Sequence, residues 1–445
     1  MTLSTFSAEA SATLGGPDWL RRRRATGFEA FSSTPLPTEN EEVWRYSPID
    51  QLSLEDFSPD IAEPRAGAGA ALAEATDLFE SVRAALGRTA ASVLMYGGRA
   101  VPATWSTASG HGDPAGFGFG PADEIAASAE MLGSVQRGGD ASVRLNDAFM
   151  ADPLFLDVPD GVTVGGPVLV VHWCDPETAA FPRLCVRAGK GAAVSVVEVF
   201  AGPQAQAAAR SLVVPVTELA AADGASVSYV SLQTLTNNAW SIARLSARGG
   251  ANSSLRTFTV GLGAAYDRIR TDVTVDGKDA HSEILSAYLG EGTQVHDIRT
   301  LQDHAAPRTT SELLCQGAVA GRSRSVYSGL IRVHRGAVRS DARQTNHNLV
   351  LDEGAHADSV PNLDILENDV KCSHASTVGP IDEDQRYYIE SRGVAPDVAE
   401  SLIVRGFFDA IIERGPVPEA TVLLQDEVHQ RLDAALGDRA VVAGV

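Results

Sequence analysis

Regularly spaced glycine turns between short β-rich runs constrain the fold of this chain more than any other feature. A glycine that precedes small polar residues and then a strand-like run recurs at Gly191, Gly224, Gly250, Gly277, Gly292, Gly321, Gly336 and Gly354. The spacing is roughly 15 residues or about twice that, as expected when each turn leads into another rung of a stacked solenoid. Runs such as LVVHW and SSLRTFTVGL have no long helical crossovers between them, which favours a β-helix. A β-sandwich, which also has many short strands and glycine turns, is the alternative.

Helical patterns flank the β-rich region on both sides. Before about residue 140, helical patches such as 77–87 alternate with polar connections, and 111–124 is expected to be a loop. After Gly379, acidic starts, glycine stops and apolar stripes at helical spacing predict helices within 382–393, 395–416 and 418–437. We therefore expect a mostly helical N-terminal domain with loops over 1–140, a β-helix core over 141–378 and a helical C-terminal domain over 379–445.

The charge balance and the cysteine content narrow the class of protein. The formal net charge is −21, so no basic stripe exists that could displace counterions from nucleic acid, and docking on an anionic membrane surface is disfavoured. Four cysteines, at 174, 185, 315 and 372, form no CxxC and no zinc-ribbon spacing, which fits a reducing compartment. Arg21–Arg24 is followed by ATGFEAF, where a secretion signal needs an apolar stretch, and the longest apolar runs are too short to span a bilayer. We therefore expect a cytoplasmic protein.

Cys372 and His374 are the strongest candidates for chemistry. They lie two residues apart in a run that is typical of a strand, so both side chains are expected on one face, with Lys371 and Ser373 on the other. A thiolate and an imidazole that point the same way suit iron or zinc better than a hard cation. Two ligands do not complete a metal site, and a purely structural role for the pair is the alternative.

The sequence around this pair resembles a known family. The segments SDARQTNHNLVL, ADSVPNLDI and DVKCSHASTVG are similar to the signature of the SufB and SufD proteins, which assemble iron–sulfur clusters. The resemblance continues through EDQRYYIESRG and, faintly, ENEEVWRYSPID. The residues of the motifs are most similar to those of SufD. It implies a right-handed parallel β-helix core between helical N- and C-terminal domains.

The resemblance also implies partners and a cargo. A SufD-like chain would pair with a SufB-like subunit through the β-helix and with a SufC-like ATPase through the C-terminal helices, with a homodimer possible in isolation. A transient iron–sulfur cluster would be shared with the SufB-like subunit. His374 would supply an imidazole ligand at that interface, and Cys372 would be either a second ligand or a small buried side chain. The Phe407–Phe408 stripe would pack the C-terminal domain on one face and dock the ATPase on another.

The remaining histidines and cysteines carry weaker expectations. His347 and His356 are expected at the surface or in hydrogen bonds between strands, and no ligand role is carried over to them. His281, His296 and His304 have no ligand spacing and are expected to be solvated. His172 and Cys174 would share a strand face, but cysteines that point into a solenoid core are common, and Cys185 and Cys315 are interpreted in the same way.

Sequence motifs of catalysis are missing. The chain has no G-x-x-x-x-G-K-[ST], so it is not the ATPase, and it has neither G-x-S-x-G nor H-E-x-x-H. These absences favour a non-catalytic scaffold subunit. Two alternatives stay open at this stage. One is a SufB-like scaffold that itself carries the nascent cluster. The other is a carbohydrate-active β-helix enzyme, which the low aromatic content of 6% disfavours.

Overall fold

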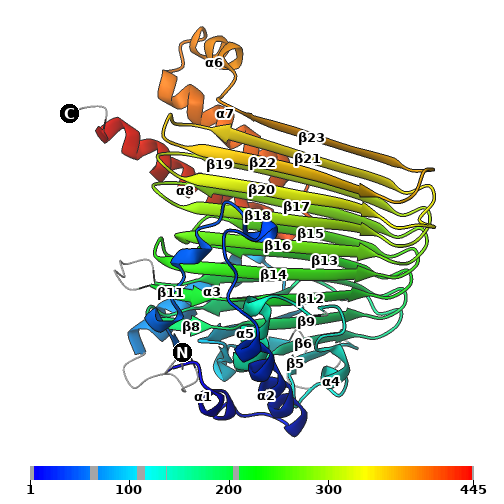
Figure 1. Cartoon of the computed structure of the whole chain (residues 1–445). Helices are drawn as coiled ribbons and strands as arrows, with labels where there is room; N and C mark the ends of the chain where they lie inside the picture. Colours follow the sequence, from blue (N-terminus) through cyan, green and yellow to red (C-terminus); the bar gives the residue numbers. More distant parts are fainter. Residues whose placement is uncertain (1–4, 61–68, 108–115, 137, 204–209, 443–445) are drawn as a thin grey trace.

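The centre of the molecule is a β-solenoid of about eight turns that spans residues 154–379 (Figure 1). The computed structural model describes residues 5–60, 69–107, 116–136, 138–203 and 210–442. The solenoid has two long sheets, and successive long strands alternate between them, so each turn of the chain adds one strand to each sheet. The predicted β-helix is therefore confirmed, and the β-sandwich alternative is wrong.

Each sheet is a stack of mostly parallel strands. The first sheet contains, in stacking order, β5 (Gly118–Pro121), β6 (Leu154–Val158), β9 (Arg183–Ala188), β12 (Val216–Ala221), β14 (Ala239–Gly249), β16 (Tyr266–Val275), β18 (Val295–His304), β20 (Arg324–Val333) and β22 (His356–Ile365), with β1 (Ser58–Pro59), β8 (Thr178–Ala180) and β11 (Ser211–Val213) beside this path. The second contains β3 (Arg99–Ala100), β2 (Ala91–Tyr96), β7 (Val168–Trp173), β10 (Ala193–Ala201), β13 (Ser226–Gln233), β15 (Ser254–Gly261), β17 (His281–Gly290), β19 (Thr310–Val319), β21 (Asp341–Val350) and β23 (Lys371–Gly379), with β4 (Ser106–Thr107) paired to β2.

The turns between strands are stacked, and this stacking explains the regular spacing of the glycines in the sequence. In one column of turns, one backbone N–H of a turn donates to a carbonyl oxygen of the next turn, for example Gly224 N to Ala251 O at 2.8 Å. Gly224 has a positive φ of 71°, a conformation in which glycine has no steric penalty. Gly277 is needed for a different reason, because a Cβ there would overlap the backbone of the turn beneath it. In other turns of the column a non-glycine residue takes the left-handed position, as Asn252 does with φ 56°. The glycines therefore mark only some of the turns.

Side chains that point into the solenoid form its central core. In the lower turns this interior is aliphatic, with Val170, Val196 and Leu219 among its fully buried members. In the upper turns polar and aromatic side chains join it, including the buried Tyr288, Tyr327 and Gln344. The alternation of strand residues therefore produces a continuous interior whose polarity rises toward the C-terminal end.

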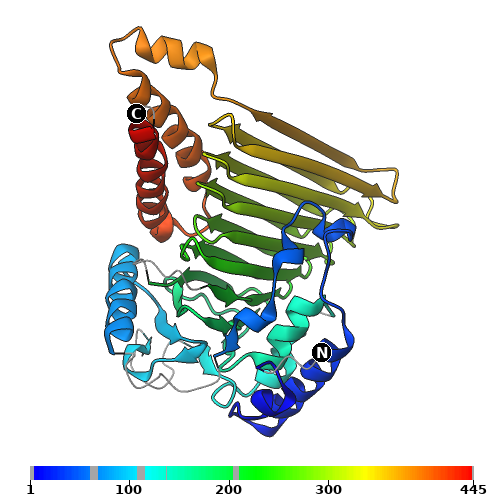
Figure 2. The ribbon, with the colours of Figure 1, turned by 60° about the vertical axis from the view of Figure 1, so that its left-hand side comes forward.

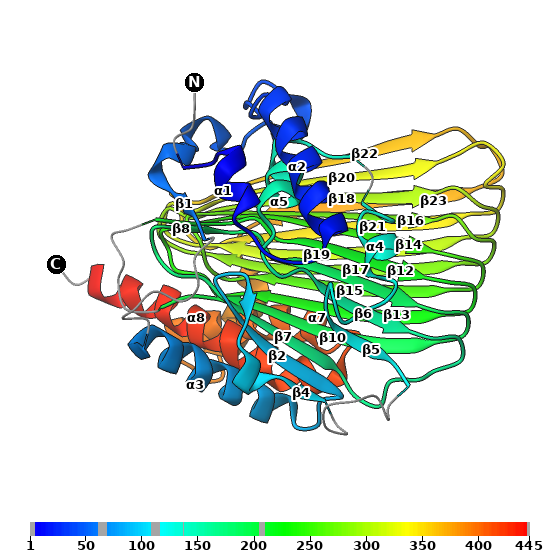
Figure 3. The ribbon, with the colours of Figure 1, turned by 90° about the horizontal axis from the view of Figure 1, so that it is seen from below.

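Helices cover both outer faces of the solenoid. The remaining elements are α1 (Ala8–Ala12), α2 (Asp18–Ser33), η1 (Glu42–Trp44), η2 (Ile49–Gln51), η3 (Leu54–Asp56), α3 (Gly69–Leu86), η4 (Pro102–Thr104), α4 (Ser128–Met131), α5 (Ala141–Phe149), α6 (Glu383–Glu390), α7 (Pro396–Ile412), η5 (Pro418–Ala420) and α8 (Thr421–Val442). The helices α3, α7 and α8 share one apolar cluster with the outer face of the second sheet. Figures 2 and 3 show α3 and α8 beside this sheet, with the N-terminal helices α1 and α2 against the first.

The segments on both sides of the solenoid show which of the predicted helices and loops form. All three C-terminal helices form; Asp382 caps α6 and Pro396 is the first residue of α7. The expected helix at 77–87 is the second half of α3. The loop expected over 111–124 is partly wrong, because β5 forms inside it and pairs with β6; residues 111–115 lie outside the described part. Among the described residues, no helix is long and apolar enough to cross a membrane.

Candidate functional site

The C-terminal end of the solenoid is open, and the predicted residues lie on its last turn. β22 pairs with β20, and β23 pairs with β21; within the described part of the chain neither strand has a second neighbour in its sheet. These two strands are at the upper end of the solenoid in Figure 1, below α6. Most of their side chains are partly or fully exposed, whereas the strands beneath them are largely buried. The end of the solenoid thus presents two strand edges with unpaired backbone groups.

Cys372 and His374 continue two columns of the solenoid interior. Cys372 is in register with Ala342, and His374 with Gln344. Both partners are buried, with 0% and 2% exposure, because they point into the interior. In-register strands keep the same orientation, so Cys372 and His374 share the inward face of β23, as strand alternation predicts. They are accessible only because no further turn covers them.

The two side chains differ in their surroundings. Cys372 is half-buried and packs at the end of an apolar cluster that includes Ile331, Val333 and Ala342. Burial and the nearby Asp341 carboxylate raise the pKa of the Cys372 thiol. The thiol is therefore protonated at neutral pH, and a metal ion that binds its sulfur must displace a proton. His374 is exposed and carries no such packing.

The described residues at the open end do not complete a metal site by themselves. Among the described residues no group of three or more His, Cys, Asp or Glu side chains could hold a metal ion. A thiol and an imidazole are suitable donors for iron, but a tetrahedral centre needs further ligands. The missing donors would have to come from another molecule that covers this end.

Polar residues beneath the open end were missed by the sequence analysis. On the second sheet, Ser286, Cys315, Asn346 and Ser376 occupy one register column on β17, β19, β21 and β23. Ser376 donates a hydrogen bond of 2.6 Å across the interior to Ser359 on β22. Burial raises the pKa of the Cys315 thiol to about 12. Strand alternation alone predicts which side chains of one strand share a face. The offset of 29 to 31 residues that aligns the strands with one another is known only from the fold.

Two of the three histidines expected to be solvated are buried, so that prediction is wrong for them. His304 lies between Thr309 and Ser311, with both ring nitrogens 2.7 Å from hydroxyl oxygens, and burial lowers its pKa to about 4. His296 stacks on Tyr288 inside the solenoid. Both occupy inward positions of β18. The polar residues next to them in the sequence do not predict that these histidines are buried. His281 is partly exposed, and its Nδ1 is 2.9 Å from the Thr310 hydroxyl.

The second candidate pair, His172 and Cys174, is buried within the protein. His172 is buried with its Nε2 2.8 Å from Glu198 Oε1, and the same carboxylate accepts hydrogen bonds from Tyr229 and Thr217. Cys174 is buried just beyond the end of β7.

Cys185 is buried as well, but it points outward, into a cluster between the solenoid and α2, and not into the core as expected. His347 is half-buried, and His356 is exposed with its Nε2 3.2 Å from Asp358. The described neighbours of these residues form no further metal centre.

The C-terminal helices have one buried and one exposed face. Val404, Phe408 and Ile411 are buried against the second sheet, and Phe407 packs at the edge of the same cluster. Large apolar side chains remain exposed on α6 and α7: Tyr387, Tyr388, Val398 and Leu402. An exposed apolar surface of this kind is typical of a binding site for another protein.

Comparisons with known proteins identify relatives that match from 42% to 90% of the chain. A family model described as "SUF system FeS cluster assembly, SufBD core domain" matches residues 172–407, from β7 into α7. The SufBD family protein Rv1462 of Mycobacterium tuberculosis is 30% identical over 418 residues, covering 90% of this chain and 88% of its own length. The SufBD family protein ML0594 of Mycobacterium leprae is 36% identical over 195 residues, covering 42% of this chain and 48% of its own length. Both are described as iron–sulfur cluster assembly proteins.

Proposed function

The chain belongs to the SufBD family of iron–sulfur cluster assembly proteins, and on this premise we propose that it is a SufD-like subunit of a SUF scaffold complex. Proteins of this family are generally non-catalytic scaffold components. The carbohydrate-active alternative has no support once the family is known. The open last turn of the solenoid, with an inward-facing thiol and imidazole, is the observation that carries the proposal.

The open end suits a partner with the same architecture. A second solenoid end could pair its terminal strands with the free edges of β22 and β23 and cover the apolar side chains exposed there. Leu363 is 42% exposed and Val378 is 43% exposed, although both stand at inward positions of the last turn. A SufB-like subunit is the partner we propose for this end, and a second copy of this chain would be the substitute when that subunit is absent.

Cluster assembly would take place where the two ends meet. His374 would offer an imidazole and Cys372 a thiolate, while the SufB-like subunit would complete the ligand set of the nascent cluster, which is cargo and not a resident cofactor. The raised pKa of Cys372 supports His374 as the more available donor at neutral pH. We therefore assign His374 the principal ligand role in this chain and Cys372 a secondary one.

A SufC-like ATPase would bind the C-terminal helices. The exposed side chains of α6 and α7, including Tyr387 and Leu402, give it an apolar contact surface, while the buried face of α7 fixes that surface to the solenoid. ATP binding by the partner would shift the scaffold toward a state with an accessible interface, because the ATPase would bind that state more tightly.

The test is co-expression with the SufB-like and SufC-like proteins of the same genome, followed by size-exclusion chromatography and iron and sulfide analysis. We expect a stable complex whose cluster content falls strongly in His374→Ala. His356→Ala is the matched control, because His356 is an exposed histidine of the last turn that points outward. Unchanged cluster content in His374→Ala would reduce the chain to an architectural partner, and failure to form any complex would refute the proposal. Cluster absorbance in the isolated chain would favour a SufB-like scaffold.

A further inference from the structure

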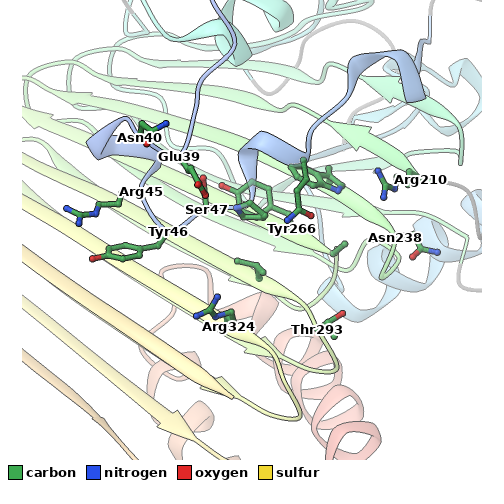
Figure 4. Close-up of a pocket in the computed structure, with 15 residues that line it drawn as sticks. Glu39, Asn40, Arg45, Tyr46, Ser47, Arg210, Asn238, Tyr266, Thr293 and Arg324 are labelled. Carbon is green, nitrogen blue, oxygen red and sulfur yellow. The ribbon is translucent and has the colours of Figure 1, made fainter. Parts of the chain in front are cut away.

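A pocket of about 800 Å³ lies on the outer face of the first sheet and reaches Arg324 on β20, the strand next to β22 of the open end. One wall is an N-terminal segment, residues 39–51, that we call the strap (Figure 4). The floor is a register column at the start of four successive strands, Trp240, Tyr266, Val295 and Arg324. The pocket is thus a groove that runs along the solenoid axis, across several turns.

The strap is fixed rigidly to the solenoid. Trp44 is 1% exposed, and the guanidinium carbon of Arg268 lies 3.7 Å from the centre of its ring. Arg268 also donates a 2.6 Å hydrogen bond to the carbonyl oxygen of Val43, and Arg299 donates one of 2.7 Å to that of Arg45. Asp297 forms ion pairs with both arginines. Because the backbone on either side of Trp44 is held, the wall of the pocket is already formed before any ligand binds.

The strap directs Arg45 and Tyr46 away from the core. Tyr46 has a φ of 69°, which is uncommon for a bulky residue and places its side chain at the surface between the buried Trp44 and Ser47. The Arg45 guanidinium lies 5.3 Å from the centre of the Tyr46 ring. Such a backbone outlier persists only where the surrounding structure imposes it, and here the result is an exposed cation beside an aromatic ring.

The charge of the pocket is opposite to that of the protein. Three arginines line it, Arg45, Arg210 and Arg324, against one carboxylate, Glu39. Arg210 forms an ion pair of 3.2 Å with Asp56. Within the described part of the chain, the guanidinium groups of Arg45 and Arg324 have no ion pair. In a chain of net charge −21 this is a local excess of positive charge, and guanidinium groups recognise carboxylates in particular.

The shape of the groove indicates the kind of anion. From β11, which follows Arg210, to β20, which begins with Arg324, there are four strand spacings, or about 19 Å. An extended peptide of about six residues has this length. Amide and hydroxyl side chains that could hydrogen-bond a peptide backbone line the groove between the arginines: Asn40, Gln51, Asn238 and Thr293. The acidic surroundings disfavour a nucleic acid strand.

We propose that this groove binds an extended acidic segment, about six residues long, of a partner protein. Carboxylates near one end of the segment pair with Arg210, and those near the other end pair with Arg45 and Arg324. The proposal does not depend on cluster assembly, so it can be tested on the isolated full-length chain.

The test is fluorescence anisotropy with a labelled hexaglutamate peptide, flanked by glycines, at low ionic strength. The wild-type chain should bind this peptide and not its hexaglutamine analogue. Arg45→Gln with Arg324→Gln should weaken binding about tenfold, since two exposed ion pairs are lost. Glu39→Gln should strengthen binding, because it removes the carboxylate that lines the pocket.

The matched control is Arg335→Gln. Arg335 is exposed and lies beyond the far end of β20, ten strand residues or about 33 Å from Arg324, and its replacement makes an equal change of charge. Unchanged affinity is expected in this variant. An equal loss of affinity in Arg335→Gln would show only a general charge effect and overturn the proposal. Absence of binding by the wild type, or tighter binding of a single-stranded hexanucleotide, would overturn it as well.

Discussion

Replacement of Glu218 by glutamine should destabilise the protein by breaking the link between the solenoid and the segment that precedes α5. The Glu218 carboxylate is 1% exposed on β12. Its oxygens accept hydrogen bonds of 2.6–2.9 Å from the backbone N–H groups of Gly133, Val135 and Gln136 and from the Arg183 side chain. Each carboxylate oxygen accepts two of these bonds, and an amide has only one oxygen.

The magnitude follows from this geometry. In Glu218→Gln the amide nitrogen would face two N–H donors, and Arg183 would lose the closer of its two carboxylate partners. Removal of one member of a buried ion pair costs about 3–5 kcal/mol. At about 2.1 cal/mol/K per residue, the unfolding entropy of a 445-residue chain is roughly 0.9 kcal/mol/K, so the melting temperature should fall by about 3–5 °C.

The pH dependence gives an independent check. Although burial acts against it, Arg183 and the backbone N–H groups hold the pKa of Glu218 below its usual value. A carboxyl whose pKa is lower in the folded state stabilises the protein above its unfolded pKa of about 4.3 and loses this contribution as the pH falls through the folded pKa. The difference between wild type and Glu218→Gln should therefore be constant from about pH 5 to pH 8 and shrink in acid.

Thermal unfolding followed by circular dichroism measures both effects. Glu130→Gln is the control, because the Glu130 side chain is 83% exposed and its carboxylate is 3.9 Å from Arg187. This control should shift stability by less than about 0.5 kcal/mol. A Glu218→Gln variant that melts with the wild type, or no differently from Glu130→Gln, would refute the reasoning.

Further substitutions test the interior, the two proposed binding surfaces and the buried histidine. Gly317→Ala should cost about 1–3 kcal/mol in chemical denaturation, because a Cβ there overlaps the Tyr288 ring, whereas Gly379→Ala meets nothing and should be neutral. Leu363→Asp should abolish association with the SufB-like partner in size-exclusion chromatography and spare the ATPase; Leu402→Asp should do the reverse, and equal effects of the two would contradict the proposed surfaces. Burial lowers the pKa of His304 from 6.5 to about 4, so the unfolded chain binds the additional proton between these values and stability should rise with pH across that window. His304→Gln should flatten this rise, and an unchanged slope in urea titrations would count against it.

Local structure was largely predictable because its signals are local. The C-terminal helices show such signals: the Asp382 side chain caps α6, and α7 begins with Pro396 and buries Val404, Phe408 and Ile411 at helical spacing. Cys372 and His374 were placed on one strand face by the two-residue period alone. The loop expected at 111–124 failed in part because β5 is only four residues long and forms by pairing with β6, which lies more than 30 residues later.

Burial was the least predictable property. The inward positions of the upper turns hold residues such as His296, Gln302 and Asn346, and a hydrophobic pattern cannot distinguish these from solvated residues. They tolerate burial because the facing strand and the turn that leads into it supply hydrogen-bond partners, as Thr309 and Ser311 do for His304. Although these partners are only five and seven residues away along the chain, they become recognisable only when the strands of the two sheets are placed facing each other.

The sequence by itself determined the repeat, the strand and helix segments, and the shared face of the cysteine and histidine pair. These follow from backbone sterics and side-chain periodicity, which act over a few residues. Only the tertiary structure decided that the last turn is uncovered, and that the strap is held by Arg268, 225 residues beyond Val43. Contacts at that separation depend on how many turns the solenoid stacks and where it ends, and no local pattern encodes either.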